Sequence, residues 1–315
     1  MAKKVGTTIG LEYDNFGVRA ARAGVEEVGG DYLSSIEAVE EVQGDFSREE
    51  QLIAGIREIK DKIEIGPNDK IVTCVTGKQI YAGQINFRRL ADEEMKNALR
   101  FEMRKNLPFE ISSATIDFNI IDAGDKKNDR VNVLVAVAAN ALMNNQLRAL
   151  EKAGLKPRAM DILPVTVANA LWLGLGKQPE PGAAGVALHI GPRISTLVFD
   201  GENASFFHRS IYFNACDLFG NTKSEMSDRE RGSRINSLID EIVRSLAFYE
   251  QTYKVSQFLF LQIMGEYSFY KELAESLAKN VSLKINPHSV LEISGYKTKA
   301  PFGKFDAAVA LAMHA

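Results

Sequence analysis

The chain has 315 residues, of which 45% are hydrophobic and 25% charged, and its 38 Lys and Arg against 41 Asp and Glu give a net charge of −3. This composition is typical of a globular protein and excludes disorder of the whole chain, while the length predicts about two domains. Because the chain has no excess of basic residues, its charge argues against nucleic acid as the main partner.

The N-terminal part alternates between strand and helix signals. Ser47 and Glu50 have the spacing of a capping box, so a helix is expected to begin at Ser47. The expected elements are strands at residues 7–12 and 17–23 around a turn at 13–16, an extended segment at 32–42, the helix from Ser47, and a strand at 70–75.

Residues 79–137 are expected to form a small α+β insert within the first half of the chain. The loop at 122–129 is rich in Lys, Asp, Asn and Gly, which is typical of a solvated hairpin connection. The elements expected here are strands at 79–87, 114–121 and 130–137 and a helix at 92–106, followed by a helix at 139–153, a strand at 157–163 and a helix opened by Pro164.

Residues 174–185 hold two prolines and several glycines and are the best candidate for a linker. After them the opening pattern returns, so a duplicated α/β fold is expected, with a first lobe at 1–176 and a second lobe at 177–315. The expected elements of the second lobe are strands at 185–190, 195–200, 205–211 and 258–263 and helices at 228–253 and 268–278.

Several common sites and signals are missing from the sequence. The longest apolar runs, 131–143 and 163–175, are shorter than the roughly 20 residues that span a bilayer, and the N-terminus lacks a secretory pattern. Two cysteines, Cys74 and Cys216, argue against a disulfide scaffold and suit a reducing cytosol. The four histidines lack metal-ligand spacing, so we expect no metal site. No P-loop or nucleophile-elbow motif occurs in the sequence.

Short segments along nearly the whole chain carry a family resemblance. They are residues 9–12 with 18–20, 99–102 with 106–109, 151–157, 241–249 and 307–312. In this order they resemble the PilM family of type IV pilus assembly proteins, a relative of FtsA within the actin-like ATPase superfamily. The resemblance implies a bilobal actin-like (ribonuclease H-like) duplicated fold, with residues 79–137 as the FtsA/PilM-type insert.

The resemblance also implies a function. PilM-like proteins are cytoplasmic scaffolds that bind the cytoplasmic tail of the inner-membrane protein PilN and connect it to the pilus motor. This implies a cytoplasmic chain that reaches the inner membrane through a partner. Two alternatives stay open: a GspL-like cytoplasmic module of a type II secretion system, and a phosphotransferase of the sugar- or acetate-kinase type.

The first phosphate turn of the family corresponds to residues 12–17. Such a turn needs small residues so that backbone N–H groups can approach phosphates, and a carboxylate to hold hydrated Mg²⁺. Glu12 keeps a carboxylate, but Asp14 stands where the family has glycine and is followed by Asn15. Asp14 adds negative charge where phosphate oxygens would lie.

The second turn departs from the family pattern as well. His189 replaces a carboxylate and Pro192 removes an N–H group, although Gly191 remains. We therefore expect no ATP hydrolysis, no catalytic residue and no cofactor, with weak ATP binding left open. The residues assigned to this degenerate nucleotide cleft are Glu12, Asp14, Asn15, Gly191, Arg193, Ser195, Glu241 and Gly265. A pairing of Arg193 with Asp14 or Glu12 across the cleft is left open as an alternative.

A partner-binding surface is expected on the helix of the insert. Its charges alone favour a solvated face, but the resemblance places this helix beside the groove for the PilN tail. The candidate contacts are Phe101, Arg104, Pro108 and Phe109.

Overall fold

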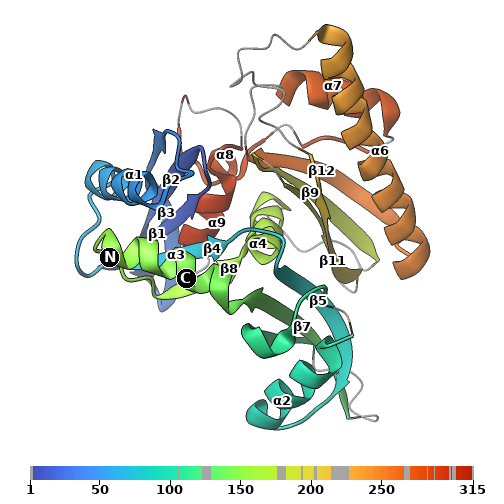
Figure 1. Ribbon diagram of the computed structural model, residues 1–315, viewed down its shortest axis with the longest axis horizontal. Helices are drawn as coiled ribbons and strands as arrows, with labels where there is room; N and C mark the ends of the chain where they lie inside the picture. Colours follow the sequence, from blue (N-terminus) through green and yellow to red (C-terminus); the bar gives the residue numbers. More distant parts are fainter. Residues whose placement is uncertain are drawn as a thin grey trace.

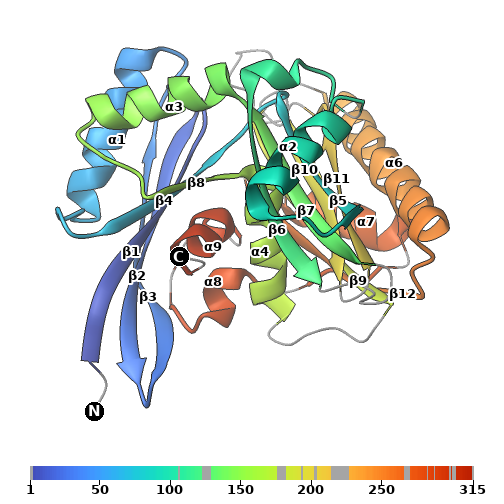
Figure 2. The same cartoon turned by 90° about the horizontal axis from the view of Figure 1, so that it is seen from below.

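The computed structural model is built from three β-sheets with helices packed on and between them (Figures 1 and 2). The residues that it describes are 3–105, 107–122, 129–175, 182–192, 194–201, 204–213, 227–265, 270–281, 283–286, 288–297, 299 and 303–313.

The first sheet has five strands in the order β3-β2-β1-β4-β8. The three N-terminal strands pair antiparallel, whereas β4 runs parallel to β1 and β8 runs parallel to β4. Helices α1 and α3 cover one face of this sheet (Figure 2). The elements are β1 (Lys3–Tyr13), β2 (Gly17–Val28), β3 (Asp31–Gln43), α1 (Glu49–Lys62), β4 (Lys70–Val75), α3 (Asn140–Lys152) and β8 (Ala159–Ile162).

The second sheet repeats this arrangement with four strands in the order β11-β10-β9-β12. Its first three strands are again antiparallel and the fourth lies parallel to the first, as β4 does beside β1. Helix α6 buries residues at helical spacing, Ile235, Leu238, Ile239 and Ile242, against one face. The elements are β9 (Ala183–Ile190), β10 (Ser195–Gly201), β11 (Ala204–Ile211), α6 (Asp228–Tyr253), β12 (Gln257–Gly265) and α7 (Tyr270–Asn280).

A third sheet, in the order β5-β7-β6, projects from the first lobe (Figure 1). Helix α2 packs on it through Met95, Leu99 and Met103, all fully buried. The elements are β5 (Ile80–Arg88), α2 (Asp92–Met103), the 3₁₀ turn η1 (Ile111–Ser113), β6 (Ala114–Asp122) and β7 (Arg130–Ala139). We propose that this sheet and its helix are the insert, and that the lobes divide near residue 176 as the sequence predicts.

Three helices, α4 (Leu163–Leu175), α8 (Val290–Ile293) and α9 (Asp306–Met313), lie between the first and second sheets. They share one apolar core with both sheets, since Ala21 and Val72 of the first and Ala187 and Val198 of the second belong to the same cluster. The two lobes are therefore joined by one common apolar core.

Most expected elements are present, but the start of α1 was predicted wrongly. The helix begins at Glu49, its N-cap is Arg48, and no side chain caps it. The Ser47 N–H is instead bonded to the carboxylate of Asp45 at 3.0 Å. A capping box does occur at Ser227 and Glu230, where α6 begins.

Candidate functional site

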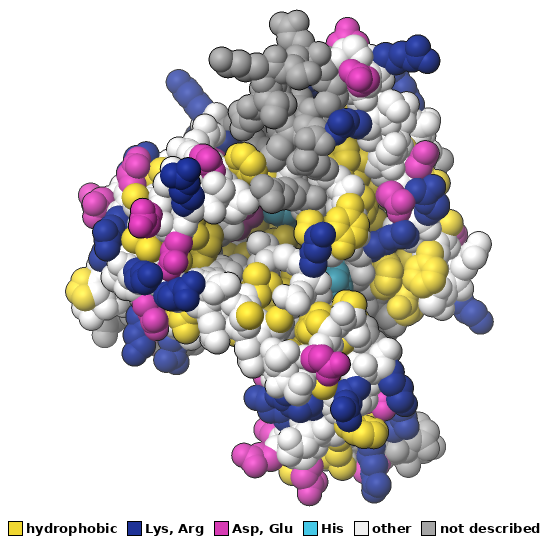
Figure 3. Space-filling model, in the orientation of Figure 1, with side chains coloured by type: hydrophobic (Ala, Val, Ile, Leu, Met, Phe, Trp, Pro, Cys, Tyr) yellow, Lys and Arg dark blue, Asp and Glu magenta, His cyan; other side chains and the backbone are white. Residues whose placement is uncertain are grey.

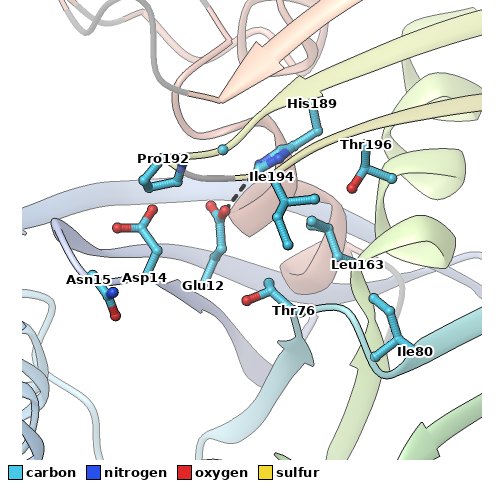
Figure 4. Close-up of a pocket in the computed structure, with 12 residues that line it drawn as sticks. Glu12, Asp14, Asn15, Thr76, Ile80, Leu163, His189, Pro192, Ile194 and Thr196 are labelled. Atoms are coloured by element: carbon cyan, nitrogen blue, oxygen red, sulfur yellow. Dashed lines mark hydrogen bonds and ion pairs between the residues drawn. The ribbon is translucent and has the colours of Figure 1, made fainter. Parts of the chain in front are cut away.

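A cavity of about 240 Å³ lies between the lobes, where the turn after β1 faces the turn after β9 (Figure 4). Small-molecule sites typically have about 300–1,000 Å³, so this cavity is small. Four of the predicted cleft residues line it: Glu12, Asp14, Asn15 and Gly191. The other lining residues are Thr76, Gly77, Ile80, Leu163, His189, Pro192, Ile194 and Thr196.

Glu12, near the end of β1, has a buried carboxylate that reaches the second lobe. Its Oε1 lies 3.1 Å from Nε2 of His189 on β9, and its Oε2 lies 3.6 Å from Nη1 of Arg19. Burial alone raises the pKa of Glu12, but Arg19 and His189 outweigh burial and lower this pKa below its ordinary value. Because an ionised carboxylate only accepts hydrogen bonds, Nε2 of His189 is the donor.

Asp14 binds the backbone of its own turn. Its Oδ1 accepts hydrogen bonds from the N–H groups of Phe16 at 2.6 Å and Gly17 at 3.0 Å. Its Oδ2 accepts from both Nη atoms of Arg19, at 3.1 and 3.2 Å. The Asp14 carboxylate thus engages donors of the turn that a phosphate would need.

Arg19 of β2 is only 2% exposed and contacts three carboxylates. Besides Glu12 and Asp14 it meets Glu41 of β3, whose Oε1 lies 3.3 Å from Nε of Arg19. The other oxygen of Glu41 lies 2.7 Å from Nζ of Lys304, which is 6% exposed. Sequence reasoning missed both cations, although an arginine within the apolar strand 17–23 was an available signal for Arg19.

The retained glycines allow the turns of the second lobe to pack closely. A Cβ atom on Gly191 would lie 2.4 Å from the carbonyl oxygen of Ile194, and one on Gly265 would lie 2.3 Å from that of Ile190. Gly265 also has a φ angle of +99°, in the left-handed region that favours glycine. Close backbone packing therefore accounts for both glycines.

Four residues assigned to the cleft are not part of the described lining of the cavity: Gly265, Ser195, Glu241 and Arg193. Ser195 is fully buried at the start of β10. Glu241 of α6 forms ion pairs with Arg209 at 2.9 Å and Arg244 at 2.6 Å, so its assignment to the cleft is not supported. Arg193 lies outside the described residues, and its pairing with a cleft carboxylate stays a prediction.

The described residues do not fit a Mg²⁺-nucleotide. Both carboxylates that could face a hydrated cation are already paired with Arg19, and Glu12 is also bonded to His189. Pro192 offers no N–H group to a phosphate. In the described parts of the chain, no cluster of three or more His, Cys, Asp or Glu side chains could hold a metal ion.

A larger groove of about 660 Å³ lies where the three sheets meet. The strands at its sides, β6 and β8, are the last strands of their sheets, so each has one edge without a neighbouring strand in the described fold. Helix α4 forms another wall, and Nε1 of Trp172 donates to Oδ2 of Asp200 at 2.7 Å. The lining includes Asp117, Phe118, Asn119, Ile121, Ala159, Met160, Asp161, Val165, Ala168, Asn169, Trp172, Asp200 and Phe206.

The predicted partner residues lie on α2 and after it, outside the lining of this groove. Phe101 is 66% exposed, and Arg104 and Pro108 are also exposed, whereas Phe109 packs against the core of the insert. A further cavity of about 450 Å³ is lined by residues of α2 and by residues 117–120 of β6. Strand β6 therefore borders both the groove and the surface beside α2.

The outer surface and the central hollow of the molecule differ in charge. Charged side chains spread over the outer surfaces in Figure 3, whereas the central hollow where the lobes and insert meet is mainly hydrophobic or uncharged. No helix within the described ranges is long and apolar enough to cross a membrane.

Comparison with known proteins identifies a family and a fold. The family model described as type IV pilus assembly protein PilM matches residues 32–213. A solved structure, a PilM-PilN type IV pilus biogenesis complex, is similar with a TM-score of 0.81 and 19% identity over 99% of both chains. This match confirms the bilobal actin-like α/β fold expected from the sequence.

Two other solved structures are more distant. The ethanolamine utilization protein EutJ from Carboxydothermus hydrogenoformans has a TM-score of 0.50 and 9% identity, over 99% of this chain and 90% of that chain. A Bacteroides thetaiotaomicron protein with an actin-like ATPase fold and unknown function has a TM-score of 0.47 and 11% identity, over 89% and 90%.

Proposed function

Because this chain belongs to the type IV pilus assembly protein PilM family, we propose that it is a non-catalytic scaffold of type IV pilus assembly. In this role it binds the cytoplasmic tail of a PilN-like inner-membrane protein and links that protein to the pilus motor. The similar structure is a PilM-PilN complex, which supports a PilN-like partner. The chain then reaches the membrane through this partner.

The observation that carries this proposal is the groove between β6 and β8. An extended tail can add to an exposed sheet edge through backbone hydrogen bonds, while pockets beside the edge select its side chains. Residues of two edge strands, β6 and β8, line this one groove, and its walls offer apolar groups such as Ile121, Val165 and Met160. These features suit an extended segment with a few apolar side chains.

The residues predicted on and after α2 provide a second candidate surface for the tail. Phe101 is a large exposed apolar side chain, and Arg104 adds a positive charge near it. Pro108 and Phe109 belong to the same proposal. A tail that lies along β6 could continue from the groove toward α2, because β6 borders both cavities.

The single tryptophan of the sequence allows a direct test. Trp172 lines the groove, so a synthetic PilN-like tail peptide without tryptophan should produce a saturable change in protein fluorescence. Ile121→Asp places a charge on the groove wall at a position that is 49% exposed, and should weaken peptide affinity at least about tenfold. Val243→Asp, on an exposed position of α6, is the matched control and should leave affinity unchanged.

Variants of α2 separate the two surfaces. If Phe101→Ala and Arg104→Ala weaken peptide binding while Ile121→Asp does not, the tail binds beside α2 and the groove assignment is wrong. If the peptide binds neither the wild type nor any variant, a PilN-like tail is not the partner and the proposed function fails.

A further inference from the structure

The turn after β1 holds an anionic side chain, the carboxylate of Asp14, among hydrogen-bond donors. Four donor atoms converge on the Asp14 carboxylate: the N–H groups of Phe16 and Gly17 and both Nη atoms of Arg19. Two backbone N–H groups and a guanidinium are the donors that proteins commonly present to a phosphate. Here they are engaged within one turn, and the Asp14 side chain itself is only 16% exposed.

The carboxylate of Glu12 links the first lobe to the second lobe. Glu12 and His189 are both buried, come from the first strands of the two lobes, and lie 3.1 Å apart in the cavity between them (Figure 4). Behind them the ion pairs continue through Arg19 and Glu41 to Lys304, which precedes α9. A bound nucleotide in an actin-like cleft would contact the same two turns from both lobes.

We infer that the cleft contains a built-in replacement for a nucleotide, in which Asp14 takes the role of a phosphate and the Glu12–His189 hydrogen bond links the two lobes across the cavity, in addition to the apolar core that they share. The lobes are therefore closed on each other without any bound nucleotide. This inference does not depend on the PilN-like partner.

Restoring glycine at position 14 tests the first part. Asp14→Gly removes the internal anion and leaves the N–H groups of Phe16 and Gly17 without their acceptor, while Arg19 keeps its ion pairs with Glu12 and Glu41. The variant should therefore bind inorganic tripolyphosphate at least about tenfold more tightly than the wild type by calorimetry. Asp45→Gly is the matched control, because Asp45 also caps a turn N–H, at Ser47, but outside the cleft. Binding of Mg-ATP or tripolyphosphate to the wild type as tightly as to Asp14→Gly overturns the inference.

The second part is tested by the distance between the lobes. Nitroxide labels at the exposed positions 58 of α1 and 250 of α6, with Cys216→Ser to avoid background labelling, report this distance by pulsed electron resonance. The wild type should show a narrow distribution that Mg-ATP does not change. His189→Ala should broaden it, whereas His189→Gln, whose amide can donate to Glu12, should keep it narrow. A distribution equally narrow in His189→Ala, or one shifted by Mg-ATP in the wild type, contradicts the lobe link.

Discussion

At the scale of single residues, His208 of β11 connects the second lobe to the insert as a neutral imidazole. Its Nε2 accepts a hydrogen bond from the backbone N–H of Ala82 on β5 at 3.1 Å, so its proton is on Nδ1. Burial lowers the pKa of His208 from 6.5 to about 4. The pKa is lower in the folded state than in the unfolded state. The contribution of neutral His208 to the free energy of unfolding is therefore fully present above pH about 6.5 and is lost as pH falls toward 4.

We therefore expect the free energy of unfolding to fall between pH 6.5 and 4 by an extra amount on the order of 2 kcal/mol because of His208. His208→Gln retains an acceptor for the Ala82 N–H group but does not titrate, so its pH dependence should be shallower. Denaturant unfolding at several pH values measures this. His288→Gln, at a side chain that is 66% exposed, is the control, and equal slopes for wild type and His208→Gln would refute the expectation.

Some residues of the cleft could be predicted from the sequence, whereas others could not. The positions of Glu12, Asp14 and Gly191 could be assigned because the turns themselves are local motifs, and all three line the cavity. Arg19 and Lys304 were not foreseen, because their contacts with Glu41 depend on strand pairing and on the return of the chain's C-terminal part to the first sheet. Residues that are brought together only by the tertiary structure show no recognisable spacing in the sequence.

At the scale of elements, β1 and α9 approach each other closely at Gly10. A Cβ atom on Gly10 would lie 2.0 Å from the carbonyl oxygen of Ala308 and 2.5 Å from the backbone nitrogen of Ala312. Both obstacles are backbone atoms of a helix and cannot rotate away. We expect Gly10→Ala to destabilise the protein by about 3 kcal/mol or more, measured by denaturant unfolding.

Gly6 provides the control for this prediction in the same strand. A Cβ atom there meets nothing within 4 Å, so Gly6→Ala should change the free energy of unfolding by no more than about 0.5 kcal/mol. Similar losses for Gly6→Ala and Gly10→Ala would mean that strand flexibility, and not the approach of α9, sets the cost.

Helices with a clear apolar period were predicted more accurately than their start signals. The predicted range of α6, 228–253, agrees with the observed Asp228–Tyr253, and its buried residues recur at helical spacing from Ile235 to Tyr249. The Ser47 capping box was wrong, because a capping pattern has only two residues and the carboxylate of Asp45 competes for the Ser47 N–H group. A short motif is easily overridden by its neighbours, whereas a long period is not.

At the scale of the whole molecule, the groove exists only because three sheets meet. Its lining comes from β6 and β7 of the insert, from β4, β8 and α4 of the first lobe, and from Asp200 and Phe206 of the second lobe. The sequence could predict the duplicated lobes from the repeated strand order, and it predicted an α+β insert. It could not predict this groove, because no local pattern records the angle at which the insert meets the two lobes.

The position of the insert against the second lobe depends on contacts between β5 and β11. Oε1 of Gln84 accepts a hydrogen bond from the N–H group of Phe206 at 2.9 Å, and the Ala82–His208 bond lies beside it. Phe206 lines the groove while Gln84 does not, so Gln84 sets the groove's shape without contacting a bound tail. Removing this one hydrogen bond should loosen the insert at a cost of about 1 kcal/mol.

Gln84→Ala should therefore weaken binding of the tail peptide by about threefold to tenfold, followed by Trp172 fluorescence, although it removes no contact with the peptide. Hydrogen exchange should rise in β5 and β11 in the same variant. Gln43→Ala removes a side chain that bonds to Glu41 within the outer strand β3, so it is the matched control and should leave both readouts unchanged. Faster exchange in β5 and β11 with unaltered peptide affinity would show that the groove does not depend on how the insert is held, and that the tail binds to one sheet alone.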